Sequence, residues 1–559
     1  MDNYQIADYF SLLSKLMDIH GENAFKSKSY ASAAFSIEKL PPLSEIPFEK
    51  IASLKGIGSS AAQKIIEILQ TGKLLSLEDI ISKTPEGIFE MLQIKGIGPK
   101  KINTIWKEME IETIGELLYA CKENRLKLYK GFGEKTQQNV IDSIEFYFKN
   151  KGRHLYAQVE MIADGLLAFL NNIFPVNKID ITGSFKRQLE IIEELEFIID
   201  TPPEIVELNM SSKEEFELTE KNEKYLQYST PLGIEIKIHS TVSELFIEDS
   251  IVLSSSVEFN TALKNIKDKK IFSAKTEEEY FMSLGLPVIP AYYREHEHAI
   301  ENIQLKKAND CIDVKDIKGI IHSHSNWSDG SNTIEEMAYA AQSLGMEYLV
   351  ISDHSKSAFY AQGLSEEKIM AQHQYIDELN IKLAPFRIFK SIESDILNDG
   401  NLDYADKILN QFDLIIASVH SNLKMNEEKA MSRLIKAIEN PFTTILGHMT
   451  GRLLLSRPGY PINHRTIIDA CAANKVVIEL NAHPSRLDID WRHIEYALEK
   501  NVLISINPDA HTIDGLNDVK YGVLTAQKAM LPKKSNLSSF SLKEFTDYIQ
   551  KTKSTKCNQ

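Results

Sequence analysis

The spacing of apolar residues separates a helical first part of the chain from a mixed remainder. In residues 1–150 apolar side chains recur every three or four positions with few β-branched runs, which predicts helices. Three short glycine-containing segments interrupt this pattern at 54–58, 94–98 and 129–133, and each precedes a further predicted helix at 59–69, 99–108 and 134–147. The repetition predicts three copies of one local structure.

From residue 151 onward, short β runs appear between amphipathic helices. Runs at 179–181, 195–199 and 234–238 predict a small α/β region, followed by less regular sequence at 241–300 and a polar linker at 301–315. From residue 316 the runs and helices alternate, which predicts βα units around a parallel sheet. The seven runs lie at 319–321, 348–351, 388–392, 414–419, 444–446, 476–480 and 503–506.

The composition is that of a globular protein with several domains. The 559 residues exceed what one core usually supports, and no run approaches the ~18 apolar residues of a membrane span. The first residues lack the layout of a signal peptide, and the four cysteines show no paired spacing. We therefore expect a cytoplasmic monomer without a membrane partner. The net charge of −16 lies mostly outside residues 1–150, so it does not exclude nucleic-acid binding there.

Metal-ligand side chains follow nearly every β run after residue 316. In a barrel of parallel strands the carboxyl ends of the strands converge on one face, so these side chains are expected to meet. Imidazoles bind zinc, manganese or iron, and carboxylates both ligate and bridge such ions. Nine ligands suit two or three divalent ions, which together can activate water and clamp a phosphate. The nine are His322, His324, Asp329, His354, Glu393, His420, His448, Asp509 and His511. Four further histidines in helical or loop sequence are assigned no role, namely His373, His464, His483 and His493.

The same region resembles the PHP (polymerase and histidinol phosphatase) domain, in particular the version attached to bacterial family X DNA polymerases. The strings IHSHSNWSDG, ISDHSKS, SIESDIL, IASVHS, ILGHMTGRLLL and INPDAH carry the resemblance. It implies a distorted (β/α)7 barrel, two to three bound ions (Mn²⁺, Zn²⁺ or Fe²⁺) and 3′–5′ exonuclease or related DNA phosphoesterase activity. It also implies that the nine residues are the ligands, with Glu393 as the bridge, and that Glu393, Asp509 and His511 act in catalysis. Arg452 and Arg486 are weaker candidates for contacts to the DNA backbone.

The three glycine-containing segments match the helix-hairpin-helix motif. In this motif two glycines let the backbone approach a phosphate, and the next helix presents its first amide groups. Such contacts bind DNA without base preference. The expected contacts come from Gly56, Gly58, Gly96, Gly98, Gly131 and Gly133. Residues 21–34 resemble the start of the small N-terminal domain of family X polymerases, which implies that Lys26 and Lys28, with Tyr30, contact a DNA 5′-phosphate.

Residues 183–187, Gly-Ser-Phe-Lys-Arg, look like the family X palm motif that holds the incoming triphosphate. The nucleotide contacts that this implies are Gly183, Ser184 and Arg187. In that family an Asp-x-Asp pair and a third Asp follow, but this chain has Glu194, Glu196 and Glu235. Misplacement by about 1 Å can cost ~100-fold in rate. We therefore interpret the palm as a DNA-holding platform; the alternative is a weak polymerase site that holds Mg²⁺ or Mn²⁺.

Across residues 1–531 the chain resembles a bacterial family X polymerase with a C-terminal PHP domain. The implied order is an N-terminal helical DNA-binding domain (1–75), a fingers-like domain with two motifs (76–150), a nucleotidyltransferase-like palm (151–240), a thumb (241–300), the linker, the PHP domain (316–535) and a tail (536–559). The primary hypothesis is a DNA repair enzyme whose PHP exonuclease acts on gapped or nicked DNA or 3′ ends, with polymerase activity weak or lost. A fully bifunctional polymerase and exonuclease is one alternative. A small-molecule phosphatase with a DNA-binding module is another.

Overall fold

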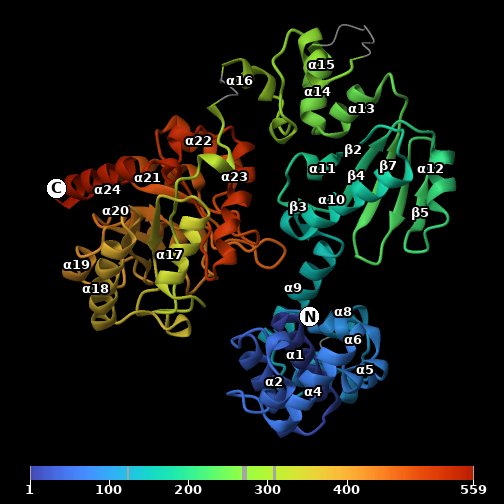
Figure 1. Ribbon diagram of the computed structural model, residues 1–559, viewed down its shortest axis with the longest axis horizontal. Coiled ribbons are helices and arrows are strands. Elements are labelled where there is room, and N and C mark those ends of the chain that lie inside the picture. The colour runs from blue at the N-terminus through green and yellow to red at the C-terminus, as the bar shows by residue number, and fades with distance from the viewer. Residues whose placement is uncertain (1, 123–124, 267–273, 306–309, 558–559) are drawn as a thin grey trace. The chain divides into compact units, whose positions relative to one another are not determined.

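The computed structural model describes residues 2–122, 125–266, 274–305 and 310–557. Contacts within the chain divide it into two compact units, Met1–Lys151 and Gly152–Gln559 (Figure 1). Among the described residues, no helix is long and apolar enough to cross a membrane.

The first unit is helical, as the apolar spacing predicts. Its core includes Phe10, Ile65 and Ile102, which are all fully buried. Asp2 caps the first helix by accepting a hydrogen bond from the backbone of Gln5, an arrangement that satisfies a free amide of the first turn. The helices are α1 Asn3–His20, α2 Ala24–Ile37, α3 Phe48–Ile51, α4 Ser59–Thr71, α5 Leu75–Ser82, α6 Glu86–Leu92, α7 Pro99–Asn103, which continues into a π-helical turn Thr104–Glu108, α8 Ile114–Lys122 and α9 Glu134–Asn150.

The second unit begins with a small α/β region. A five-stranded mixed sheet has the order β2-β4-β7-β6-β5, in which only β4 and β7 are parallel. Apolar residues of β4 and β7 alternate with charged ones, so one face packs against α10 and α12 and the other carries glutamates. The elements are β1 His154–Leu155, α10 Tyr156–Ile173, β2 Ile179–Thr182, α11 Gly183–Lys186, β3 Ile191–Ile192, β4 Glu194–Ile199, α12 Pro203–Met210, β5 Glu217–Lys221, β6 Tyr225–Ser229 and β7 Glu235–Ser240.

Residues 241–300 are more helical than their sequence suggests. Phe259, Tyr280 and Phe281 form the centre of a separate small core there. Its helices are α13 Phe246–Leu253, α14 Val257–Ile266, α15 Glu277–Ser283 and α16 Ala299–Leu305. The last of these extends into the predicted linker 301–315, of which residues 306–309 lie outside the described part of the chain.

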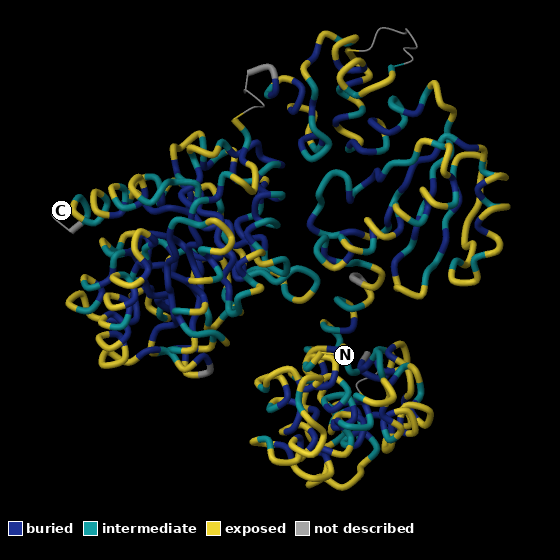
Figure 2. Tube along the Cα trace, viewed as in Figure 1, coloured by how far each residue is buried: buried dark blue, intermediate teal, exposed yellow. Residues whose placement is uncertain are grey.

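The C-terminal region is a parallel barrel of seven strands, which confirms the predicted fold class. The strands follow one another in the order β14-β13-β12-β11-β10-β9-β8, and a bridge between Ser323 and Ala510 joins the two end strands beyond their last regular pairs. Nearly every strand residue is buried, as Figure 2 shows in dark blue, because helices α17–α23 cover the outside. The strands are β8 Gly319–Ile320, β9 Tyr348–Ile351, β10 Arg387–Asp395, β11 Leu414–Ser418, β12 Ile445–Leu446, β13 Val477–Asn481 and β14 Ile504–Asn507. The helices are α17 Ile334–Ser343, α18 Glu366–Leu383, α19 Asp406–Leu409, α20 Glu427–Glu439, α21 His464–Asn474, α22 Ile494–Glu499 and α23 Val519–Gln527.

The last helix, α24 Leu542–Cys557, packs on the end of the barrel where the strands begin. Phe545 is fully buried, and its ring stacks on that of Tyr348 at the start of β9, with the centroids 4.4 Å apart. The predicted tail 536–559 therefore contains, within its described residues, a helix that contributes to the barrel core.

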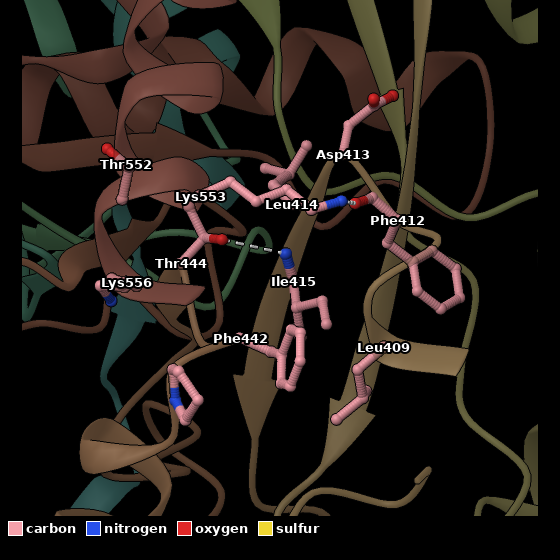
Figure 3. Close-up of a pocket in the computed structure, with 11 residues that line it drawn as sticks. Leu409, Phe412, Asp413, Leu414, Ile415, Phe442, Thr444, Thr552, Lys553 and Lys556 are labelled. Atoms are coloured by element: carbon pink, nitrogen blue, oxygen red, sulfur yellow. Dashed lines mark hydrogen bonds between the residues drawn. The ribbon is translucent and has the colours of Figure 1, made fainter. Parts of the chain in front are cut away.

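A shallow cleft lies beside α24 at this same end of the strands (Figure 3). Phe412 and Leu414 line it from the start of β11, and Lys553 of α24 donates hydrogen bonds to the carbonyls of Asn410 and Phe412 at 2.6 and 2.7 Å. The lysine satisfies carbonyls that precede a buried strand. In barrels of this kind, the end where the strands begin usually serves stability and the opposite end carries the chemistry.

Candidate metal centre

The nine predicted ligands lie at or just beyond the carboxyl ends of the barrel strands. Every barrel strand except β13 contributes at least one of them. His322 and His324 flank Ser323, and Asp509 and His511 flank Ala510, so the bridge that closes the barrel sets these four side chains together. His322 and Asp509 both have left-handed backbone, with φ of 70° and 54°. Such conformations are uncommon outside glycine and persist where the surrounding contacts enforce them.

The ligand atoms gather into three overlapping groups, in each of which they lie within 4.8 Å of one another. The first contains His324, Asp329, His354 and His511, the second His322, His324 and Asp509, and the third His354, Glu393 and His420. Because His324 and His354 each belong to two groups, the three form one continuous centre. Each group offers the mixture of imidazole and carboxylate that zinc, manganese and iron accept.

Glu393 occupies the middle of this centre. Its carboxylate oxygens lie 2.9 Å from Nδ1 of His354, 3.1 Å from Nε2 of His420, 3.0 Å from Nε2 of His448 and 3.3 Å from Nε2 of His322. His448 reaches the centre through this contact. A carboxylate that faces four imidazoles is placed to bridge ions held by different groups.

The centre has buried polar atoms that a metal ion would satisfy. Within the described part of the chain, Nε2 of His322 and Nδ1 of His324 are buried without a hydrogen-bond partner. Leaving such groups unpaired is costly, and native proteins rarely do so. The donor set and these unpaired atoms therefore fit divalent ions.

Mutual attraction sets the charges of the centre. Burial alone would raise the pKa of Glu393 and Asp509, but the surrounding imidazolium groups outweigh it and hold both pKa values well below their ordinary range. Burial and two neighbouring imidazoles lower the pKa of His324 to about 3. The two carboxylates are ionised and His324 is neutral, which are the forms that bind metal ions.

One side of the centre faces solvent. The side chains of His511 and Asp329 are 39% and 29% exposed, whereas those of His322 and His324 are fully buried. A substrate phosphate would therefore approach from the side of His511 and Asp329.

Sequence reasoning missed buried carboxylates that support the ligands. Asp353 directly precedes His354 but turns away from the centre, accepting hydrogen bonds from the backbone and hydroxyl of Ser325, the hydroxyl of Ser328 and the amide of Gln372 at 2.5–2.8 Å. It thereby fixes the loop that carries Asp329. Two other carboxylates, Asp395 and Glu479, contact ligand histidines directly. The signal for Glu479 was a charged residue inside a short run of apolar ones.

The two arginines proposed from the sequence differ in their surroundings. Arg452 pairs with Asp490 at 2.7 Å and donates to the carbonyls of Arg486 and Leu487, so it is engaged in holding two loops together. Arg486 lies with its Nε 3.6 Å from Oδ2 of Asp509, at the edge of the centre. Of the two, only Arg486 lies beside one of the nine ligands.

Glu194, Glu196 and Glu235, the three glutamates of the palm, do not form a cluster of metal-ligand side chains like that of the barrel. Glu194 pairs with Lys237 at 2.7 Å, and Glu196 pairs with Nε2 of His239 at 2.9 Å. Glu235 lies opposite Glu194 in the parallel register of β4 and β7. Among the described residues, no group with the spacing of a metal site includes any of these glutamates.

The predicted nucleotide contacts lie on α11 (Gly183 and Ser184) and directly after its end (Arg187). Gly183 has φ of 66°, and a Cβ on it would lie 1.9 Å from Oε1 of Glu196, so only glycine lets this loop sit against that carboxylate. Arg187 pairs through Nε with Glu295 at 2.6 Å, and its carbonyl accepts a hydrogen bond from Lys528 at 3.0 Å. Ser184, the third predicted contact, lies between them on α11.

The three glycine repeats share one conformation. Their first glycines, Gly56, Gly96 and Gly131, have φ between 86° and 94°, which side chains disfavour. Their second glycines, Gly58, Gly98 and Gly133, cap α4, α7 and α9 with extended backbone and no side-chain hydrogen bond at the cap. The first amides of these helices are therefore not covered by a capping side chain, as the motif requires.

The proposed contacts to a 5′-phosphate divide into exposed and buried ones. Lys26 and Lys28 are exposed near the start of α2. Tyr30 is buried against Phe10, with the ring centroids 5.8 Å apart, and its hydroxyl lies 3.2 Å from that of Ser60. Tyr30 is therefore part of the core of this unit.

Similarity to known proteins follows the same division of the chain. Residues 1–74 match a helix-hairpin-helix domain, residues 88–145 a SAM-like helix-hairpin-helix tandem, and residues 321–483 the PHP domain. The chain is 31% identical to "DNA polymerase/3'-5' exonuclease PolX" of Bacillus subtilis, over 99% of this chain and 100% of that protein. A "Probable phosphatase" of Acetivibrio thermocellus is 26% identical over 42% of this chain and 95% of its own length. Another, of Caldanaerobacter subterraneus, is 29% identical over 29% of this chain and 60% of its own length.

Proposed function

This chain belongs to the PolX family, whose Bacillus subtilis member it matches from end to end, and from this premise we propose that its PHP barrel is a metal-dependent 3′–5′ DNA exonuclease. The observation that carries the proposal is the convergence of nine metal-ligand side chains at one end of the barrel. The palm would contribute weak polymerase activity or none.

The residues of the barrel divide the work of phosphodiester hydrolysis. Ions held by the three groups would supply a hydroxide near neutral pH and positive charge for the phosphate. Glu393 would be a ligand shared by more than one group, and Asp509 and His511 would be further ligands, of which His511 lies on the side that solvent reaches. Arg486, at the edge of the centre, would orient the backbone of the DNA end by its planar donors.

DNA is the substrate class that the rest of the chain favours. The helix-hairpin-helix domains that we place at 1–75 and 76–150, together with Lys26 and Lys28, would hold the DNA backbone without base preference. The palm (151–240) and thumb (241–300) would add further contacts to gapped or nicked DNA. The PHP domain (316–535) would then remove nucleotides from the 3′ end.

The low estimate of polymerase activity follows from the contacts of the palm. Lys237 neutralises Glu194, and His239 occupies a carboxylate oxygen of Glu196; a lysine ammonium cannot itself be a metal ligand. A fully bifunctional enzyme stays the second candidate, because the Bacillus subtilis relative carries both activities in its name.

Two kinds of substrate separate this proposal from a small-molecule phosphatase, which the names of the shorter relatives favour. With Mn²⁺, the protein is expected to release nucleotides from the 3′ end of a recessed DNA duplex and to leave histidinol phosphate intact. His420→Ala is expected to stop the release, whereas His493→Ala, outside the three groups, is the matched control and keeps it. Hydrolysis of the monoester without degradation of DNA would contradict the proposal.

A further inference from the structure

Strand β13 brings none of the nine proposed ligands, yet it carries two polar side chains into the barrel. Glu479 and Asn481 alternate with Ile478 and Leu480, and all four are fully buried. A buried carboxylate is costly unless hydrogen bonds compensate for the lost water. Their contacts therefore show what these side chains are for.

Glu479 holds two of the ligand histidines. Its Oε1 lies 2.6 Å from Nδ1 of His322 and accepts a hydrogen bond from the amide of Asn507 at 2.8 Å, and its Oε2 accepts one from the backbone amide of His448 at 2.7 Å. An ionised carboxylate only accepts hydrogen bonds, so the proton of His322 must sit on Nδ1. In the neutral imidazole, which is the form that binds metal ions, Nε2 of His322 then carries the free lone pair, and this atom faces Glu393.

Asn481, two residues further along β13, supports a third ligand. Its side-chain amide donates to Oδ2 of Asp509 at 3.0 Å. His322 and Asp509 belong to the same group of ligands, together with His324. Side chains of strand β13 therefore support two members of one ligand group, that of His322, His324 and Asp509.

A second carboxylate backs a different group. Asp395, at the end of β10, lies in hydrogen-bond contact with Nδ1 of His420 and accepts from the hydroxyl of Ser357 at 2.6 Å. Nε2 of His420 faces Glu393 at 3.1 Å. The remaining group is built differently, because Nδ1 of His511 lies 2.9 Å from the main-chain carbonyl of Asp509.

We propose that Glu479 and Asp395 are positioning residues that each secure a separate ion site of the centre. Glu479 serves the group of His322, His324 and Asp509, and Asp395 serves the group of His354, Glu393 and His420. Each carboxylate fixes the tautomer and ring orientation of one histidine and makes it a better ligand. The inference rests on the proposed function only in requiring that the three groups bind metal.

The test counts ions rather than reaction products. Full-length wild type, Glu479→Gln and Asp395→Asn are stripped with a chelator and titrated with Co²⁺, whose absorption reports ligation, and bound metal is measured after gel filtration. Each variant is expected to bind about one ion fewer than wild type at low free metal, with about 10–100-fold weaker affinity at the affected position. Asp413→Asn is the matched control, because its carboxylate accepts from the amide of Lys390 at the opposite end of the barrel.

Unchanged metal binding in both variants, or loss of every ion in either, would overturn the inference of two separately secured positions. Circular dichroism of the metal-free proteins shows whether each variant folds, and if Glu479→Gln does not, the titration of Asp395→Asn decides. Wild type that binds ions but degrades no DNA would contradict the proposed function and leave this inference standing.

Discussion

The barrel and the palm place the same kinds of residue, carboxylates and histidines, on the faces of two different sheets. In the barrel, Glu393 meets four histidines whose lone pairs can bind metal. In the palm, Glu194 and Glu196 meet the side chains of Lys237 and His239 on the neighbouring strand. An acidic residue therefore indicates a metal site only when several ligand side chains surround it. Glu194 meets an ammonium, which cannot bind a metal ion, and Glu196 meets a single histidine.

Topology adds to the difference. Strand ends in a closed parallel barrel bring together side chains that are far apart in sequence, such as His324 and Asp509, whose Nε2 and Oδ1 lie 3.0 Å apart. In the palm, β4 and β7 pair directly, so a carboxylate on one strand meets side chains that are opposite or diagonal to it in the register. In this chain Lys237 of β7 reaches Glu194 of β4 and occupies one of its carboxylate oxygens.

The largest expected effect is the loss of nuclease activity when the barrel centre is opened. His322→Ala/His324→Ala removes ligands from two of the three groups and is expected to lower the rate of 3′-end shortening by about 1,000-fold, since ions supply several kcal/mol of charge stabilisation. Gel analysis of a labelled primer measures it. Shortening at more than a tenth of the wild-type rate would mean that the hydrolytic site lies elsewhere.

Removing metal ions with a chelator is expected to lower the thermal stability through the barrel centre and not through the palm. An ion present at 1,000 times its dissociation constant stabilises the folded state by about 4 kcal/mol, so EDTA should lower the melting temperature of wild type. Glu194→Ala/Glu196→Ala should respond as wild type does, and His322→Ala/His324→Ala should respond much less. Calorimetry with and without EDTA measures both. An equal response from all three proteins would place the stabilising ions outside the barrel.

Replacing the three glutamates of the palm by aspartates tests whether carboxylate length limits polymerase activity. Glu194→Asp/Glu196→Asp/Glu235→Asp is expected to raise primer extension by about 100-fold from near background, because each carboxylate moves back by one methylene. Extension is measured with dNTPs and Mn²⁺ in the His322→Ala/His324→Ala background, where shortening does not interfere. Wild type that already extends the primer efficiently would show that the glutamates hold ions despite Lys237 and His239.

A histidine outside the centre provides the smallest effect. His373 is buried on α18 against Phe412, with ring centroids 4.9 Å apart, and burial lowers its pKa to about 4. Between pH 6.5 and about 4 the unfolded chain binds the proton more readily, so wild type should lose about 3 kcal/mol of stability as the pH falls through this window. His373→Leu should lack this loss.

Urea unfolding of the metal-free proteins at several pH values measures the difference between wild type and His373→Leu. Parallel stability curves for the two would show that burial does not lower the pKa of His373 in the fold. His373 would then not differ from the ligand histidines in the way that its burial outside the centre predicts.

Much of the barrel could be predicted from the sequence because its signals are local. All seven strands appear where short apolar runs predict them, and six of these runs end in ligand residues. The runs are buried on both faces, so the pattern is strong. Strand β5 was missed because its residues, Glu217–Lys221, are all exposed and mostly charged. The helix α24 was missed because its apolar positions, such as Phe545, are buried only by contact with distant barrel residues such as Tyr348.

The supporting residues of the centre lay beyond sequence reasoning for a physical reason. The role of Glu479 depends on the distance between its carboxylate and a histidine 157 positions earlier in the chain, which only the closed barrel fixes. In the sequence, Arg452 and Arg486 both lie beside site motifs and cannot be told apart. In the structure, Arg452 pairs with Asp490, whereas Arg486 lies near Asp509. Such differences arise from packing and leave no periodic pattern.

One measurement tests most directly whether the chemistry lies in the barrel and the palm is retired. A 5′-labelled gapped primer–template is incubated with Mn²⁺, with and without dNTPs, and with wild type, His322→Ala/His324→Ala or Glu194→Ala/Glu196→Ala. The account predicts that the primer only shortens, that the histidine changes stop this and that the glutamate changes do not. A primer that lengthens with dNTPs in wild type, and no longer does so in Glu194→Ala/Glu196→Ala, would contradict it.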